Sequence, residues 1–227
     1  KIKSIRTDPF TRQVLKNIHY LFEGYSDKII LDPEDMTSKQ ISPWIHERWS
    51  YFHEILGNFE LSIKHLEIVS ENLNNNSWIH ARLGWLYEKL EKLEKSAYHY
   101  SIFLKNHPEA FEINFRLANV KLLLGNESST IEIYENILSK RPNNDLVLNN
   151  LAWLLLTAKD KELRNIEKGF DLALKSVDIS PTIDNLDTLA EAYFQLGKIK
   201  KAIQVIRKAA VELDYPVNRQ PYLRKQL

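Results

Sequence analysis

Apolar residues occur along most of the chain in pairs of helix-length stretches, and a short polar break separates the two stretches of each pair. Between Asn76 and Pro142, a first apolar stretch of about a dozen residues, a break and a second stretch occur twice in succession. This arrangement predicts units built of a helix, a turn and a second helix.

The units repeat at a constant stride. Leu83, Gly84, Tyr87, Tyr100 and Pro108 are followed 34 residues later by Leu117, Ala118, Lys121, Tyr134 and Pro142. A fixed period of this length is typical of stacked two-helix units, in which each unit contacts only its neighbours. Extended over the chain, the stride predicts five units, at residues 43–76, 77–110, 111–144, 145–182 and 183–216.

The fourth unit is longer than the others. Pro181 follows Pro142 by 39 residues instead of 34. The extra residues are charged and polar and fall around Lys159–Asn165, which places them in the loop between the two helices of that unit. Gly57, Gly125 and Gly197 fall at the helix-to-helix turns of other units, where glycine adopts a positive φ at low cost.

Both ends of the chain lie outside the repeats. Residues 1–42 contain one amphipathic stretch followed by Asp32 and Pro33, which predicts an N-terminal capping helix and a linker. Residues 217–227 predict the start of a C-terminal cap. A tether or a further domain beyond either end stays open.

Several residues at the repeated positions resemble the tetratricopeptide repeat. In the second unit these are Leu83, Gly84, Tyr87, Ser96, Tyr100 and Pro108, and in the fifth they are Leu189, Ala190, Tyr193, Gly197 and Ala202. Lys121, Thr130 and Gly169 depart from the family pattern. The resemblance implies an all-α fold, a right-handed superhelix (α-solenoid) of about five helix–turn–helix repeats, with the first helix of each repeat on the concave face.

Composition and charge remove several classes of function. The 31 basic and 30 acidic residues nearly cancel, so the sequence predicts no general attraction to nucleic acid. No stretch of about 18 apolar residues is present, which predicts no membrane span. The absence of cysteine excludes disulfides and thiolate sites. It leaves the compartment open, with a cytoplasmic location slightly favoured over a membrane-tethered or periplasmic one.

Candidate chemistry is sparse. His46 and Glu47 begin like a zinc-protease motif, but the next histidine is His53, at i+7 instead of i+4. The remaining histidines, His65 among them, are interpreted as surface or groove residues. Asp184, Asp187 and Glu191 share a helical face and could serve a metal or an acid–base pair, but a solvated acidic face is the favoured interpretation. The sequence therefore predicts no catalytic residue, no metal and no cofactor.

The resemblance also implies which side chains point into the concave groove and could contact a partner. They are Trp44, Arg48, Tyr51, Trp78, Arg82, Trp85, Phe115, Arg116, Asn119, Asn149, Asn150, Trp153, Asp187 and Glu191. Arg48, Arg82 and Arg116 recur at the 34-residue stride and would form a ladder of guanidinium groups. The alternative is structural: the tryptophans belong to the core, and each arginine pairs with a neighbouring carboxylate.

These features predict a protein–protein interaction module, an adaptor or assembly scaffold that binds a segment of a partner protein in its groove. Acidic residues of that segment are expected opposite the three arginines, and basic residues near the last unit, opposite Asp184, Asp187 and Glu191. Two alternatives stay open. The chain could be the regulatory or substrate-presenting arm of a larger enzyme or membrane protein, or a scaffold that assembles with copies of itself into a homo-oligomer.

Overall fold

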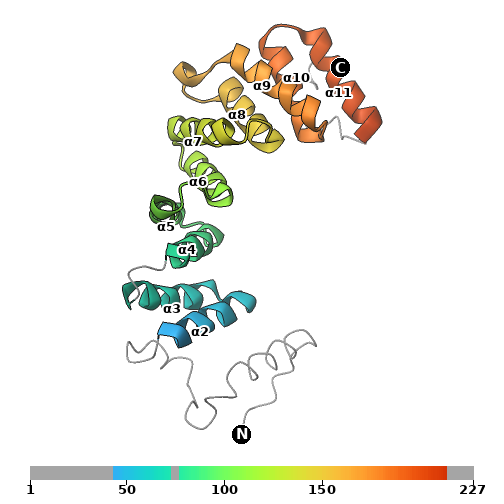
Figure 1. The fold of residues 1–227 in the computed structure, drawn as a ribbon. Coiled ribbons are helices and arrows are strands. Elements are labelled where there is room, and N and C mark those ends of the chain that lie inside the picture. Colours follow the sequence, from blue (N-terminus) through green and yellow to red (C-terminus); the bar gives the residue numbers. More distant parts are fainter. Residues whose placement is uncertain (1–42, 73–76, 214–227) are drawn as a thin grey trace. The chain divides into compact units, whose positions relative to one another are not determined.

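The computed structural model describes residues 43–72 and 77–213, and within these ranges every regular element is a helix (Figure 1). The helices are α2 (Pro43–Ile55), α3 (Phe59–Asn72), α4 (Ser77–Lys89), α5 (Leu93–Asn106), α6 (Phe111–Leu123), α7 (Glu127–Lys140), α8 (Asp145–Thr157), the short 3-10 helix η2 (Lys161–Leu163), α9 (Ile166–Ile179), α10 (Ile183–Gln195) and α11 (Ile199–Leu213). The expected N-terminal cap and the start of the C-terminal cap lie outside the described residues.

The first helices of successive pairs follow the 34-residue spacing of the sequence repeat. The first helices of successive pairs begin at Pro43, Ser77, Phe111, Asp145 and Ile183, so the spacings are 34, 34, 34 and 38 residues. The last spacing is longer because η2 and its flanking residues lie between Thr157 and Ile166. The predicted all-α fold of consecutive helix pairs, an α-solenoid, is confirmed.

The chain divides into two compact units. Unit 1 comprises Lys1–Leu90 and contains α2, α3 and α4, and unit 2 comprises Glu91–Leu227 and contains α5 to α11. Within each unit, helices that are neighbours along the chain pack on one another, and in unit 2 α8 also contacts α10 directly. Each unit is described by itself below.

Unit 1 has a small core between α3 and α4. Leu66, Val69, Leu83 and Leu86 have no exposed surface. Removing a side chain of this size from water contributes roughly 2 kcal/mol. Tyr87 extends this core and donates a hydrogen bond of 2.5 Å to Glu67 Oε1, and burial together with this bond raises the pKa of Tyr87 well above its usual value.

Unit 2 has a longer core that continues from one helix pair to the next. Tyr134, Ala152 and Ala190 are fully buried, and each belongs to a different cluster of buried side chains within this core. Small residues permit the helices of a pair to approach closely. At Gly169 on α9, an added Cβ would lie only 2.9 Å from Leu156 Cγ on α8. The absence of a side chain at Gly169 is therefore what lets these two helices pack.

The turns between paired helices depend on left-handed backbone conformations. Gly57, Gly125 and Gly197 have φ values of 74°, 78° and 73°, and Glu91 has a φ of 55° at the corresponding position.

A Cβ at Gly125 would have no neighbour within 4 Å, so only backbone strain opposes a side chain there. We expect Gly125→Ala to lower the free energy of unfolding by about 1 kcal/mol, measured by chemical denaturation. Asparagine tolerates this conformation, so Gly125→Asn should lower the free energy of unfolding clearly less than Gly125→Ala does. Equal decreases for the two variants would contradict the explanation by backbone strain.

Candidate functional site

A hollow of about 500 Å³ opens on unit 2 along the first helices of its last three repeats. We call it the amide hollow, because asparagines from three helices line it. Its polar lining residues are Asn119, Tyr134, Asp145, Asn149, Asn150, Thr182, Asp184, Asn185, Asp187 and Thr188, and its apolar ones are Leu122, Leu146 and Trp153. Its volume falls in the range of 300–1,000 Å³ that is usual for ligand-binding sites.

A hydrogen-bonded group joins three helices at one side of the amide hollow. Tyr134 of α7 is fully buried and donates a 2.8 Å hydrogen bond to Asn119 Oδ1 of α6. Burial raises the pKa of Tyr134, and a hydrogen bond with Asn150 of α8 opposes that rise. The hydroxyl group of Tyr134 is thus hydrogen-bonded to two asparagines of the hollow, Asn119 and Asn150.

On α10, the buried polar groups at the hollow are satisfied by the backbone. Asn185 is 3 % exposed, and its Nδ2 donates to the carbonyl oxygens of Ser176 and Ser180 at 3.3 and 2.7 Å. Thr188 Oγ1 donates to the carbonyl oxygen of Asp184 at 3.1 Å. The side chain of Thr182 caps α10 by accepting from the backbone nitrogen of Asn185.

Asn149 differs from these residues. It is 8 % exposed on α8, and its Oδ1 is buried without a hydrogen-bond partner among the residues that the structure describes. Leaving a buried acceptor unpaired costs about 1–3 kcal/mol. This oxygen is enclosed by the surrounding protein and is not open to the hollow.

The other groove residues predicted in unit 2 lie in varied surroundings. Trp153 is 41 % exposed at the amide hollow, whereas Phe115 is half-buried and packs against the core beside Tyr134. Arg116 forms a 3.0 Å ion pair with Glu112, one turn earlier on α6. Glu191 is 8 % exposed and accepts a 2.7 Å hydrogen bond from Gln195.

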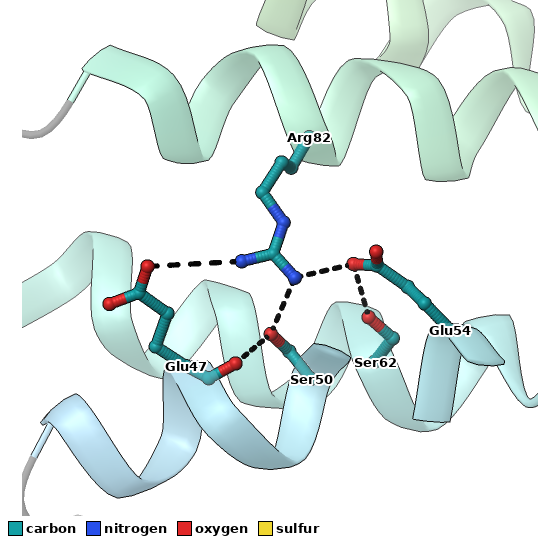
Figure 2. A network of polar contacts seen from close by, with 5 residues as sticks. All are labelled: Glu47, Ser50, Glu54, Ser62 and Arg82. Atoms are coloured by element: carbon teal, nitrogen blue, oxygen red, sulfur yellow. Dashed lines mark hydrogen bonds and ion pairs between the residues drawn. The ribbon is translucent and has the colours of Figure 1, made fainter. Parts of the chain in front are cut away.

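In unit 1, Arg82 is the centre of a polar network. Figure 2 shows its guanidinium reaching from α4 to three side chains of α2. Arg82 Nη2 donates to Glu54 Oε1 at 2.7 Å and to Ser50 Oγ at 3.0 Å, and Nη1 lies 4.0 Å from Glu47 Oε1. Ser62 of α3 donates to the same oxygen of Glu54 at 3.2 Å. The network ties the three helices of unit 1 together, and a role of Arg82 in partner contact stays a prediction.

Aromatic side chains reach the surface of unit 1. Trp44, Tyr51 and Trp78 are 41 %, 56 % and 61 % exposed. The guanidinium of Arg48 lies 5.3 Å from the ring centre of Trp44, a cation–π contact. Trp85 instead packs against the core of unit 1, with its ring edge-to-face against Phe59 at 5.9 Å.

The histidines of unit 1 correct one expectation from the sequence. His65 is 2 % exposed, so it is not a surface or groove residue, and it meets the equally buried His46 and His53 of α2. His46 Nδ1 and His65 Nδ1 are 2.8 Å apart, and the rings of His53 and His65 stack at 5.5 Å. Burial, helped by the charges of His46 and His53, lowers the pKa of His65 to about 4, and burial lowers the pKa of His53.

These histidines are not arranged as a metal centre. Over residues 43–72 and 77–213, no three histidine, cysteine, aspartate or glutamate side chains are placed to hold a metal ion. The same part of the chain contains no helix long and apolar enough to span a bilayer.

Comparison with known proteins identifies the repeat. Residues 183–210, which cover α10 and most of α11, match the family model of the tetratricopeptide repeat. The last helix pair is thus similar to a tetratricopeptide repeat. A search of curated proteins finds no match. Tetratricopeptide repeats are protein–protein interaction modules and are generally not catalytic, and this chain has their fold.

Solved structures of other tetratricopeptide-type proteins resemble the chain. A tetratricopeptide repeat protein from Parabacteroides merdae superposes with a TM-score of 0.69 at 15 % identity, covering 76 % of this chain and 67 % of that one. MamA from Desulfovibrio magneticus RS-1 gives a TM-score of 0.65 at 17 % identity, covering 75 % and 94 %. Another MamA structure gives 0.66 at 15 % identity, covering 74 % and 90 %. At these identities the likeness shows the fold alone.

Proposed function

We propose that this chain is an adaptor or assembly module that binds an extended segment of a partner protein in the amide hollow of unit 2. The observation that carries the proposal is the hollow itself, about 500 Å³ in volume, with a half-exposed indole beside side chains that can hydrogen-bond a peptide.

The chemistry of the lining favours a peptide as the ligand. Thr182, Asn185 and Thr188 are already hydrogen-bonded within the chain. The lining groups left to pair with a peptide backbone are Nδ2 of Asn119 and the carboxylates of Asp145 and Asp184. Trp153 adds a flat apolar surface, and tryptophan is enriched among the residues that dominate binding free energy at protein interfaces. The lining residues that the structure describes include no arginine or lysine, which argues against nucleic acid as the partner.

The proposal can be tested with peptides selected from a random library on the full chain. We expect Trp153→Ala to weaken the selected peptides by about thirtyfold, since truncating a central aromatic anchor typically costs about 2 kcal/mol or more. Affinities would be measured by fluorescence anisotropy. Because Trp153 is partly exposed, the variant should keep its fold, and circular dichroism would verify this.

Tyr98→Ala is the matched control, because Tyr98 is a 63 % exposed aromatic on α5 that does not line the hollow. Its loss should leave the affinities unchanged. If the selected peptides bind Trp153→Ala and the unsubstituted chain equally well, the hollow is not the binding site and the proposal is wrong.

A further inference from the structure

Positive charge is concentrated on the last helix of unit 2, α11, and on the residue that precedes it. From Lys198 to Lys208 the chain carries five basic residues and no acidic one, although the whole chain has a formal net charge of only +1. We call these five the α11 cations: Lys198, Lys200, Lys201, Arg207 and Lys208. All of them are exposed, so this segment presents a local positive field in a chain that has almost no net charge.

The α11 cations are held at the surface because the opposite face of the helix is buried. Ala202, Ile206 and Ala209 are 1–2 % exposed, and the last two belong to the core that α11 shares with α10. Lys200 and Arg207 are seven residues apart, so they lie on one side of the helix, about two turns apart. Folding thus fixes the backbone that carries these charges in a row along one helix.

Most of this charge is not offset by carboxylates. Apart from Lys208, the α11 cations form no ion pair with the side chains that the structure describes, and the proposal below depends only on these four. Asp171 and Asp178 of α9 are exposed, and neither of them is in an ion pair with the four. Elsewhere in unit 2, by contrast, Lys140 lies 2.8 Å from Glu109 Oε1. The α11 cations are therefore available to acidic groups of another molecule.

A second hollow, of about 450 Å³, opens among these charges. We call it the basic hollow, and its described lining residues are Tyr193, Lys201, Gln204, Val205 and Lys208. The ammonium group of Lys201 lies 5.6 Å from the ring centre of Tyr193. This cation–π contact positions the ammonium group at the hollow and leaves its charge in place. The basic hollow and the amide hollow share no described lining residue, so they are separate sites.

We propose that the basic hollow and the α11 cations form a second interaction surface, which binds an acidic segment of a partner protein. Each lysine offers three N–H donors that pair with a carboxylate by charge-assisted hydrogen bonds. The seven residues from Lys200 to Arg207 span about 10 Å along the helix. An extended chain advances about 3.3 Å per residue, so acidic side chains three positions apart match this separation.

This surface fits a nucleic acid or an anionic membrane less well. Single-stranded nucleic acids stack their bases on aromatic rings, but Lys201 lies over the ring of Tyr193, the one aromatic residue among the described lining residues. A helix that binds at a bilayer surface buries apolar side chains in the lipid. Among residues 183–209 no large hydrophobic side chain is exposed. An acidic peptide needs neither feature.

The test uses the full chain and a fluorescein-labelled peptide of about ten residues, with glutamate at every third position and serine between. A second peptide has glutamine in place of each glutamate. We expect the glutamate peptide to bind at least tenfold more tightly by fluorescence anisotropy, and this difference should shrink at high salt. Lys201→Gln with Arg207→Gln should weaken the glutamate peptide about fivefold, since two exposed ion pairs are lost.

Lys140→Gln with Lys168→Gln is the matched control. It removes the same net charge from two exposed lysines that are already paired, with Glu109 and Glu135. The affinity of the glutamate peptide should change less than twofold. Equal losses in the two double variants, or equal binding of the glutamate and glutamine peptides, would overturn the proposal.

Two further probes test the class of partner. They are a thymidine oligonucleotide and vesicles that contain phosphatidylserine. If either binds the chain more tightly than the glutamate peptide does, and loses that binding in the variant with Lys201→Gln and Arg207→Gln, the surface serves a nucleic acid or a membrane and the proposal of an acidic protein segment is wrong.

Discussion

Acidification from about pH 7 to about pH 5 is expected to destabilise unit 1, because His65 is buried against two other histidines. The pKa of His65 is about 4 in the folded chain and about 6.5 when the residue is exposed. In this window the unfolded chain takes up a proton that the folded chain does not, so the free energy of unfolding falls as the pH falls. At about 1.4 kcal/mol for each pKa unit, the loss is about 2 kcal/mol by pH 5 and reaches roughly 3 kcal/mol only below pH 4. Burial lowers the pKa of His53 as well, which adds to the loss in the same direction.

Tryptophan fluorescence can report on unit 1 alone. Four of the five tryptophans, Trp44, Trp49, Trp78 and Trp85, belong to this unit, and only Trp153 belongs to unit 2. In a Trp153→Phe chain, denaturant unfolding followed by fluorescence should show a midpoint that falls steeply below about pH 6.5.

His65→Gln is the control for this prediction. Glutamine can still hydrogen-bond His46 but does not titrate, so the slope of stability against pH should become shallower, with a remainder from His53. A midpoint that does not change between neutral and mildly acidic pH, or a slope that is identical in the variant, would contradict the assignment.

The repeat and the helices follow from the sequence because both depend on local periodicity. The 34-residue stride placed the first helices, and the glycine at the turn after α6 has the expected positive φ. The departures from the family pattern at Thr130 and Gly169 did not change the fold. Thr130 Oγ1 donates to the backbone of its own helix and to the carbonyl oxygen of Ala118, so the hydroxyl is accommodated inside the helix pair.

The sequence does not predict the histidine cluster as long as histidine counts as a polar surface residue. The signal for its burial is nevertheless present in the spacing. His65 lies three residues after Ser62 and four before Val69, on the face of α3 that is buried against its neighbours. His46 and His53 are two helical turns apart on α2 and are likewise buried. When most residues on one face of a helix are small or apolar, that face packs against the core, and a histidine on it is expected to be buried as well.

The arginine and hollow residues could be predicted only in part. The sequence offered a carboxylate neighbour for each arginine, but which one pairs with Arg82 depends on the packing of α4 on two other helices. Three of the hollow's four asparagines were among the predicted groove residues, namely Asn119, Asn149 and Asn150, and Asn185 was not. Asn185 Nδ2 has two partners because two backbone carbonyl oxygens lie within reach, whereas no donor reaches Asn149 Oδ1. No spacing rule contains either fact.

Asn149→Leu is expected to stabilise the chain. Leucine has a similar shape, and it removes a buried acceptor that has no partner, so the free energy of unfolding should rise by about 1 kcal/mol or more.

Asn185→Leu is the matched control, because it is the same substitution at a second buried asparagine of the same hollow. Here two hydrogen bonds are lost and the carbonyl oxygens of Ser176 and Ser180 lose a donor. The free energy of unfolding should fall by about 2 kcal/mol, which puts the two variants about 3 kcal/mol apart with opposite signs. Denaturant unfolding of both chains measures the difference. If Asn149→Leu loses stability as Asn185→Leu does, then Asn149 Oδ1 has a partner in the folded chain and the explanation fails.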